Sequence, residues 1–245
     1  MKKIIYISTI LVLCFYKSFA ADYNASLFGC ISDGQTNNTG SIQYAVNYIA
    51  KKGGGTLHFY VGRYLTGGIE LKSNVTIELH EGAILVGTAS IYDYIGSLKH
   101  RSLLYAKDQS NIKIIGKGVI QGQGKLLEDS QKKQAAHGFI DLAKPTYAPS
   151  LIGFDNCTDI VIDGIMLQDA IGPIQAYKDC KNLQLANQTI INKGNRDSIG
   201  LLLENCKAVK LSHLFIDVDG KAISKDNSSQ VLSMEKCITP DGNSI

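Results

Sequence analysis

The sequence predicts an all-β solenoid preceded by a capping helix, and its internal repeats are the main reason. A polar residue, a cysteine, two turn-forming residues and an alternating apolar strand recur at residues 156–162, 179–185 and 205–211. The cysteines of these copies, Cys157, Cys180 and Cys206, are 23 and 26 residues apart, a period typical of solenoid coils. Weaker copies at residues 74–79 and 111–116 extend the pattern. Because each coil buries its apolar face against its neighbours, we expect one domain over residues 21–245.

Residues 1–20 have the pattern of a secretory signal peptide. Lys2 and Lys3 precede an apolar run that ends near Tyr16, and a small-x-small cleavage site ends at Ala20. The run is too short for a transmembrane helix. We therefore expect export to the periplasm or the extracellular space, with no membrane attachment after cleavage.

The charge balance excludes an obvious nucleic-acid partner. The chain has 25 basic and 22 acidic residues, and three of its lysines lie in the first twenty residues. Cleavage there would leave 22 of each sign, without the basic excess of a nucleic-acid-binding protein.

One helix is expected before the strands begin. Ile42, Ala45, Val46 and Ile49 have the spacing of a single apolar helix face, and the helix would start near Ser41 and stop before three consecutive glycines. A helix at this place would cover the open end of the solenoid, where unpaired strand edges favour aggregation.

Short strands follow along the chain, at residues 56–60, 69–71, 72–79, 82–87 and 111–116. The periodicity breaks over residues 126–150, which include Pro145 and Pro149. We interpret this segment as a long loop leaving one face of the solenoid, and such loops often carry function.

The cysteines are interpreted as a buried, stacked ladder of small apolar side chains. A disulfide framework or a metal site is the alternative, but no short Cys-x-x-Cys or histidine spacing suits zinc. The expectation is therefore no metal and no cofactor. A faint last copy spans residues 230–237 with no evident polar cap after it, which leaves open a partner chain or second copy at that end, or a shortened solenoid.

Several motifs together resemble glycoside hydrolase family 28, the polygalacturonase-like family of the pectin lyase-like superfamily. They lie at residues 41–46, 53–59, 62–67 and 71–77, and residues 116–124 are similar to the family's G-x-G-x-I-D-G-x-G turn. The cysteine-centred copies resemble its N-C-x-N-V-x-I coils. The resemblance covers about residues 22–238 and implies a single-stranded right-handed parallel β-helix, in a short and divergent member of the family.

The resemblance implies hydrolysis, with inversion, of the α-1,4 bonds between galacturonic acid residues. Such a reaction needs one carboxylic acid to protonate the leaving oxygen and carboxylates that activate water on the opposite face of the sugar. The family supplies three aspartates, from an N-x-D motif and from a D-D pair one coil later.

This sequence departs from the family pattern at the site itself. With Cys206 as anchor, the first catalytic aspartate falls on Ile199. A second register takes Asp197 as the N-x-D aspartate and requires an insertion before the cysteine. One coil later the D-D pair falls on Gly220 and Lys221, with Asp219 just before them. The best register therefore does not retain the catalytic aspartates.

The candidate catalytic residues are accordingly Asp197, Asp217 and Asp219, and the candidate substrate-binding residues are Lys221 and Lys225. Aspartates are also common turn residues and exposed lysines are often only solvated, so a structural role for each remains an alternative.

Three functions stay open at this stage. The first is an exported hydrolase of pectic or other acidic plant polysaccharide, with that polysaccharide as its partner. The second is a non-catalytic relative, a pseudoenzyme that binds acidic polysaccharide. The third is a uronate lyase that uses a lysine base.

Overall fold

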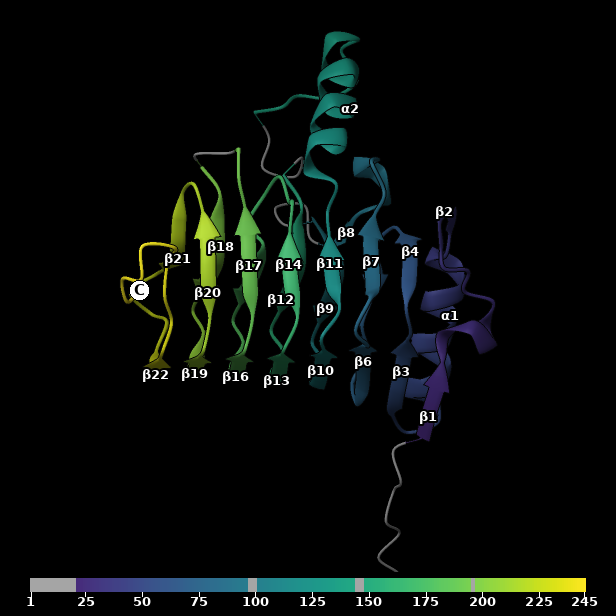
Figure 1. The fold of residues 1–245 in the computed structure, drawn as a ribbon, viewed down its shortest axis with the longest axis horizontal. Coiled ribbons are helices and arrows are strands. Elements are labelled where there is room, and N and C mark those ends of the chain that lie inside the picture. The colour runs from purple at the N-terminus through teal and green to yellow at the C-terminus, as the bar shows by residue number, and fades with distance from the viewer. Residues whose placement is uncertain (1–20, 97–100, 144–147, 195–196) are drawn as a thin grey trace, which may run out of the picture.

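The computed structural model describes residues 21–96, 101–143, 148–194 and 197–245. The predicted signal peptide lies outside this range. Within it the chain winds into a parallel β-helix whose complete coils each contribute one strand to each of three sheets (Figure 1). The predicted fold class is confirmed, and no helix of the described residues has the length and apolarity needed to cross a membrane.

The three sheets run along the solenoid axis, and their strands are listed here in spatial order. Sheet A contains β1 (Ala21–Asn24), β3 (Gly55–Phe59), β6 (Val75–Leu79), β10 (Ser110–Gly116), β13 (Thr158–Asp163), β16 (Lys181–Ala186), β19 (Lys207–Ser212) and β22 (Val231–Glu235). Sheet B contains β2 (Asp33–Asn37), β4 (Gly62–Thr66), β7 (Ala83–Gly87), β11 (Val119–Gln121), β14 (Met166–Gln168), β17 (Thr189–Asn192) and β20 (Phe215–Val218). Sheet C contains β5 (Ile69–Glu70), β9 (Arg101–Lys107), β12 (Ser150–Asp155), β15 (Gln175–Lys178), β18 (Ile199–Glu204) and β21 (Lys221–Lys225), and β8 (Ile95–Gly96) pairs antiparallel with β9.

Helix α1 (Thr39–Lys51) lies at the N-terminal end of the solenoid (Figure 1). Ile42, Ala45, Val46 and Ile49 are its buried residues, as the apolar periodicity predicts. Two short 3-10 helices, Ala25–Phe28 and Ile91–Asp93, complete the regular structure of this half.

The segment predicted as a long loop differs in the structure, because its first part is helix α2 (Gly124–Ala136). This helix extends away from the strands of sheet B (Figure 1). It buries only a narrow face that includes Leu127 and Gln131, and its surface pairs Lys125 with Asp129 and Lys132 with Glu128 at i,i+4 spacing. A wide apolar stripe is absent from the sequence, which is why the helix was not predicted.

The predicted cysteine ladder is present. Cys157, Cys180 and Cys206 are free and completely buried, and each follows a strand of sheet C. The Cys180 thiol contacts the Phe154 carbonyl oxygen at 3.4 Å, one coil below. The thiols thus act as small core groups that stack from coil to coil.

Side-chain ladders also fix the turns at which the coils stack. Asn156, Asp159, Asn182 and Asn205 all have positive φ angles of 50–57°, a region that asparagine and aspartate tolerate better than other non-glycine residues. The Asn182 amide donates to the Asp159 carboxylate at 2.9 Å. Asn205 makes the same bond to Asp179, at 2.7 Å. The turn residues therefore supply both the backbone conformation and the link between coils.

Candidate active site on the edge between sheets B and C

The acidic residues singled out in the sequence gather where the strands of sheet B end and the chain turns into sheet C. Asp217 lies within β20, and Asp219 follows its end. One coil earlier, Lys193 and Gly194 follow β17 at the equivalent turn. Because parallel coils stack at a spacing of about 4.8 Å, side chains from successive turns meet at this edge.

Asp197 and Asp219 occupy equivalent positions on consecutive coils. Ile199 of β18 pairs in register with Lys221 of β21, and each aspartate stands two residues before its strand. The two are 22 residues apart in the sequence. The two aspartates therefore keep the same offset from their strands, and the two residues that precede Asp197 in the N-x-D motif lie outside the described part of the chain.

A lysine that the sequence analysis missed connects the acidic residues. The Lys193 ammonium group pairs with Asp217 and lies 3.3 Å from the Asp219 carboxylate. The hydrogen bond to Asp217 is the main reason that the pKa of Lys193 is raised. The Gly194 backbone N–H donates to the second oxygen of Asp219 at 2.7 Å. Asp219 is therefore held by two groups from the preceding coil.

Asn192 adds a buried amide beneath this turn. Its side chain is 2% exposed, and its oxygen accepts from the Ala170 N–H at 3.1 Å. Its amide nitrogen is buried without a hydrogen-bond partner among the described residues. The backbone N–H of Asp219 donates to the backbone carbonyl of Asn192 at 3.3 Å. The unsatisfied amide nitrogen of Asn192 therefore belongs to a residue that contacts the acidic cluster directly.

Three adjoining depressions surround Lys193. Two of them have volumes of about 340 Å³ and the third about 280 Å³. The first depression of 340 Å³ is bounded by Lys125 and Glu128 of α2 and shares Asp169 with the depression of 280 Å³. The second depression of 340 Å³ extends to Asp241 near the C-terminus. Volumes of this size lie at the lower end of the range for small-ligand sites. The insertion carrying α2 therefore forms one wall of an open groove whose lining includes charged side chains.

The two candidate substrate-binding lysines lie at opposite ends of β21. Lys221 is exposed, two residues after Asp219, and its N–H donates to the Ser198 carbonyl at 2.9 Å. Lys225 pairs in register with the buried Leu203 and lies about 13 Å farther along the strand at 3.3 Å per residue. Lys221 thus adjoins the acidic cluster, whereas Lys225 does not.

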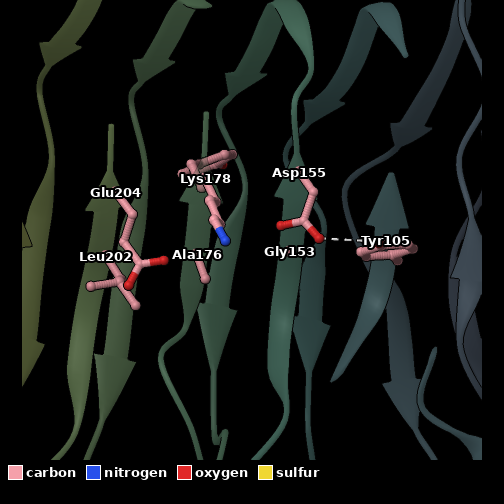
Figure 2. Close-up of a pocket in the computed structure, with 8 residues that line it drawn as sticks. Tyr105, Gly153, Asp155, Ala176, Lys178, Leu202 and Glu204 are labelled. Atoms are coloured by element: carbon pink, nitrogen blue, oxygen red, sulfur yellow. Dashed lines mark hydrogen bonds between the residues drawn. The ribbon is translucent and has the colours of Figure 1, made fainter. Parts of the chain in front are cut away.

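The outer face of sheet C carries a second polar surface, shown in Figure 2. Asp155, Lys178 and Glu204 are register partners on β12, β15 and β18, so their charges alternate from coil to coil. Gly153 and Ala176 leave a shallow strip beside them. The small side chains make this face flat enough for an extended chain to lie across the coils.

Tyr105 closes one end of that strip. Its hydroxyl donates to the Asp155 carboxylate at 3.0 Å (Figure 2). Burial, followed by the neighbouring Asp155 charge, raises the pKa of Tyr105 well above its usual value. The phenol is therefore a stable hydrogen-bond donor at neutral pH.

Comparison with known proteins identifies the family. The model of glycosyl hydrolases family 28 matches residues 59–245. The chain is 26% identical to the exo-poly-alpha-D-galacturonosidase of Dickeya chrysanthemi over 91% of its own length, but it spans only 41% of that enzyme.

Solved structures show the same fold. A candidate glycosyl hydrolase from Parabacteroides merdae superposes with a TM-score of 0.85 at 42% identity, covering 91% of this chain and 99% of that one. The family 28 exopolygalacturonase of Yersinia enterocolitica has a TM-score of 0.76 at 23% identity, covering 84% of this chain and 45% of that enzyme. The matched family model and these structures, together with the coil architecture, show that this chain belongs to glycoside hydrolase family 28.

Proposed function

We propose that this protein is an exported, polygalacturonase-like hydrolase of pectic or other acidic plant polysaccharide. The observation that carries the proposal is the equivalent placement of Asp197 and Asp219 on consecutive coils, with Asp219 paired to Lys193, which lines the open groove. In such a reaction one carboxylate accepts the proton of the attacking water molecule, and a carboxylic acid protonates the leaving oxygen.

The surrounding charges suit an acidic substrate. Lys193 and Lys125 supply cations along the groove, Lys221 is exposed two residues after Asp219, and ammonium groups bind carboxylates such as those of galacturonate. The ion pair with Lys193 and the hydrogen bond from Gly194 hold Asp219 in one position, which catalysis by proton transfer requires. Export is supported by the sequence of the first twenty residues.

The test is incubation of the purified protein with polygalacturonate, followed both by reducing-end release and by ultraviolet absorbance of unsaturated products. Hydrolysis yields reducing ends without absorbance. Asp197→Asn and Asp219→Asn should each lower the rate about 10²–10⁴-fold, the usual contribution of acid–base groups.

The matched control is Asp163→Asn, which makes the same substitution at the end of β13 in sheet A and keeps an acceptor for the Asn187 amide. Wild-type rates in either Asp197→Asn or Asp219→Asn, with an active parent protein, would remove that residue from the mechanism.

Binding without turnover is a second candidate, and one observation favours it. Neither neighbour of Asp219 in the sequence, Val218 or Gly220, is acidic, and Lys193 already pairs with both Asp217 and Asp219. If calorimetry detects binding of oligogalacturonate while neither reducing ends nor ultraviolet-absorbing product is released, the protein is a binding protein and the hydrolase proposal is refuted.

The lyase alternative is disfavoured at Lys193, because a lysine base needs a lowered pKa and this one is raised. Absorbance of unsaturated product would nevertheless reveal a lyase that uses another base.

A further inference from the structure

Two histidines and a glutamate converge on the outer face of sheet A, near the N-terminal end of the solenoid. His58 lies on β3, its register partner Glu78 lies on β6, and His80 follows the end of β6. One ligand atom from each of the three lies within 4.8 Å of the others. None of the acidic residues of the candidate active site belongs to this sheet.

The distances within this cluster fit the corners of a metal coordination tetrahedron. His58 Nδ1 lies 3.0 Å from His80 Nε2 and 3.4 Å from Glu78 Oε2. His80 Nε2 lies 3.8 Å from Glu78 Oε1. Zinc binds histidine nitrogen and carboxylate oxygen at about 2.0–2.2 Å, so tetrahedral ligand atoms are separated by about 3.4 Å. The separations of 3.0 and 3.4 Å that start from His58 are close to this value. The separation of 3.8 Å from His80 ends at the other Glu78 oxygen, so a small rotation of the Glu78 carboxylate would bring one oxygen to both histidines.

The surroundings of the histidines fix their orientation. Asp22 of β1 places a carboxylate oxygen 3.3 Å from His58 Nε2, on the opposite side of the ring from the cluster. A carboxylate that accepts from the far nitrogen of a metal-bound histidine is a common supporting contact, which sets the tautomer and ring angle. Tyr60 stacks on the His80 ring, with centroids 4.5 Å apart and planes at 7°.

The cluster is also accessible to an ion from solution. The His58, Glu78 and His80 side chains are 13%, 27% and 35% exposed. Three protein ligands at a partly exposed place leave a fourth corner for water. Two imidazoles and one carboxylate favour zinc and neighbouring transition metals over magnesium or calcium, which prefer all-oxygen sites.

We propose that His58, Glu78 and His80 bind one divalent transition-metal ion of the zinc type, with Asp22 as a positioning residue. The ion joins β3 to β6 directly and β1 through Asp22, so it clamps the first coils beside the capping helix. Its role is to stabilise this end of the solenoid, independently of the polysaccharide chemistry proposed above. The sequence analysis assigned no metal ligands because His58 and His80 are 22 positions apart, which corresponds to one coil rather than to a short motif.

The test is calorimetric titration of the purified protein, free of any affinity tag, with ZnCl₂, and titration with Co²⁺ followed by visible absorbance. We expect one ion per chain and the absorption bands of tetrahedral cobalt. Zinc at a hundredfold excess over its Kd should raise Tm by roughly 5–10 °C. His58→Ala and His80→Ala should each abolish the stoichiometric binding, and Asp22→Asn should weaken it about 10–100-fold.

Two further variants separate loss of ligand from loss of fold. Glu78→Gln keeps the side-chain shape and should weaken binding while circular dichroism stays unchanged. His137→Ala removes an exposed histidine outside the cluster and should leave binding intact. Absence of a one-to-one zinc complex would overturn the proposal, as would zinc binding that survives in both His58→Ala and His80→Ala. The cluster would then be a hydrogen-bonded pair of histidines only.

Discussion

A chain of three hydrogen-bonded polar side chains lies buried inside the solenoid. The Tyr177 hydroxyl donates to Gln175 Oε1 at 2.7 Å, and Gln175 Nε2 donates to Gln188 Oε1 at 2.7 Å. Gln188 Nε2 then donates to the Ile162 carbonyl at 3.0 Å. Tyr177, Gln175 and Gln188 are each at most 1% exposed. Every member depends on the next one, because water does not reach these groups.

We expect Tyr177→Phe to destabilise the protein by about 1–3 kcal/mol, because it leaves the buried Gln175 oxygen without its donor. The ring itself remains, so the edge contact with Phe154, at 5.7 Å between centroids, is preserved. For a protein of this size the loss corresponds to a fall in Tm of roughly 2–12 °C. Urea denaturation followed by circular dichroism measures the change in the free energy of unfolding.

The matched control is Tyr44→Phe, which removes the same hydroxyl from an exposed position on α1. Its effect should stay within about 0.5 kcal/mol, as for ordinary surface substitutions. A Tyr177→Phe effect no larger than that of the control would refute the reasoning, because it would show that the Gln175 oxygen finds another partner.

Two further predictions concern the turns. Hydrogen bonds from the Ser228 and Ser229 side chains hold the pKa of Asp226 well below its usual range, so its stabilising effect is present at neutral pH and is lost as the pH falls below about 4. Asp226→Asn should therefore lower the urea midpoint at pH 7, with a gap that narrows in acid; an equal gap at both pH values would contradict this. Gly164 has a φ of +80°, and a Cβ there would overlap the Gly116 carbonyl oxygen, whereas Gly53, at +99°, faces open space. Gly164→Ala should cost about 1–3 kcal/mol more than Gly53→Ala in the same denaturation assay, and equal losses would show that the coils can separate at this turn.

The sequence alone determined the architecture. The cysteine-centred copies and the apolar face of Ile42, Ala45, Val46 and Ile49 are local periodic patterns, and a repeating coil can bury such patterns in only a few ways. Helix α2 was not predicted because its buried face is narrow and its stability depends on the solenoid beneath Leu127. Polar side chains on a helix of this kind give little periodic signal.

The candidate site was only partly predictable, since it depends on how the coils stack. Asp217 and Asp219 were named from the sequence, but Lys193 was not, because no motif links a lysine to an aspartate 26 residues later. The same holds for His58 and His80. Turns can gain or lose a residue without disturbing the strands, so distance along the chain does not give the register between coils. Only the tertiary structure, in which parallel strands align one coil above the next, decides which charged side chains meet.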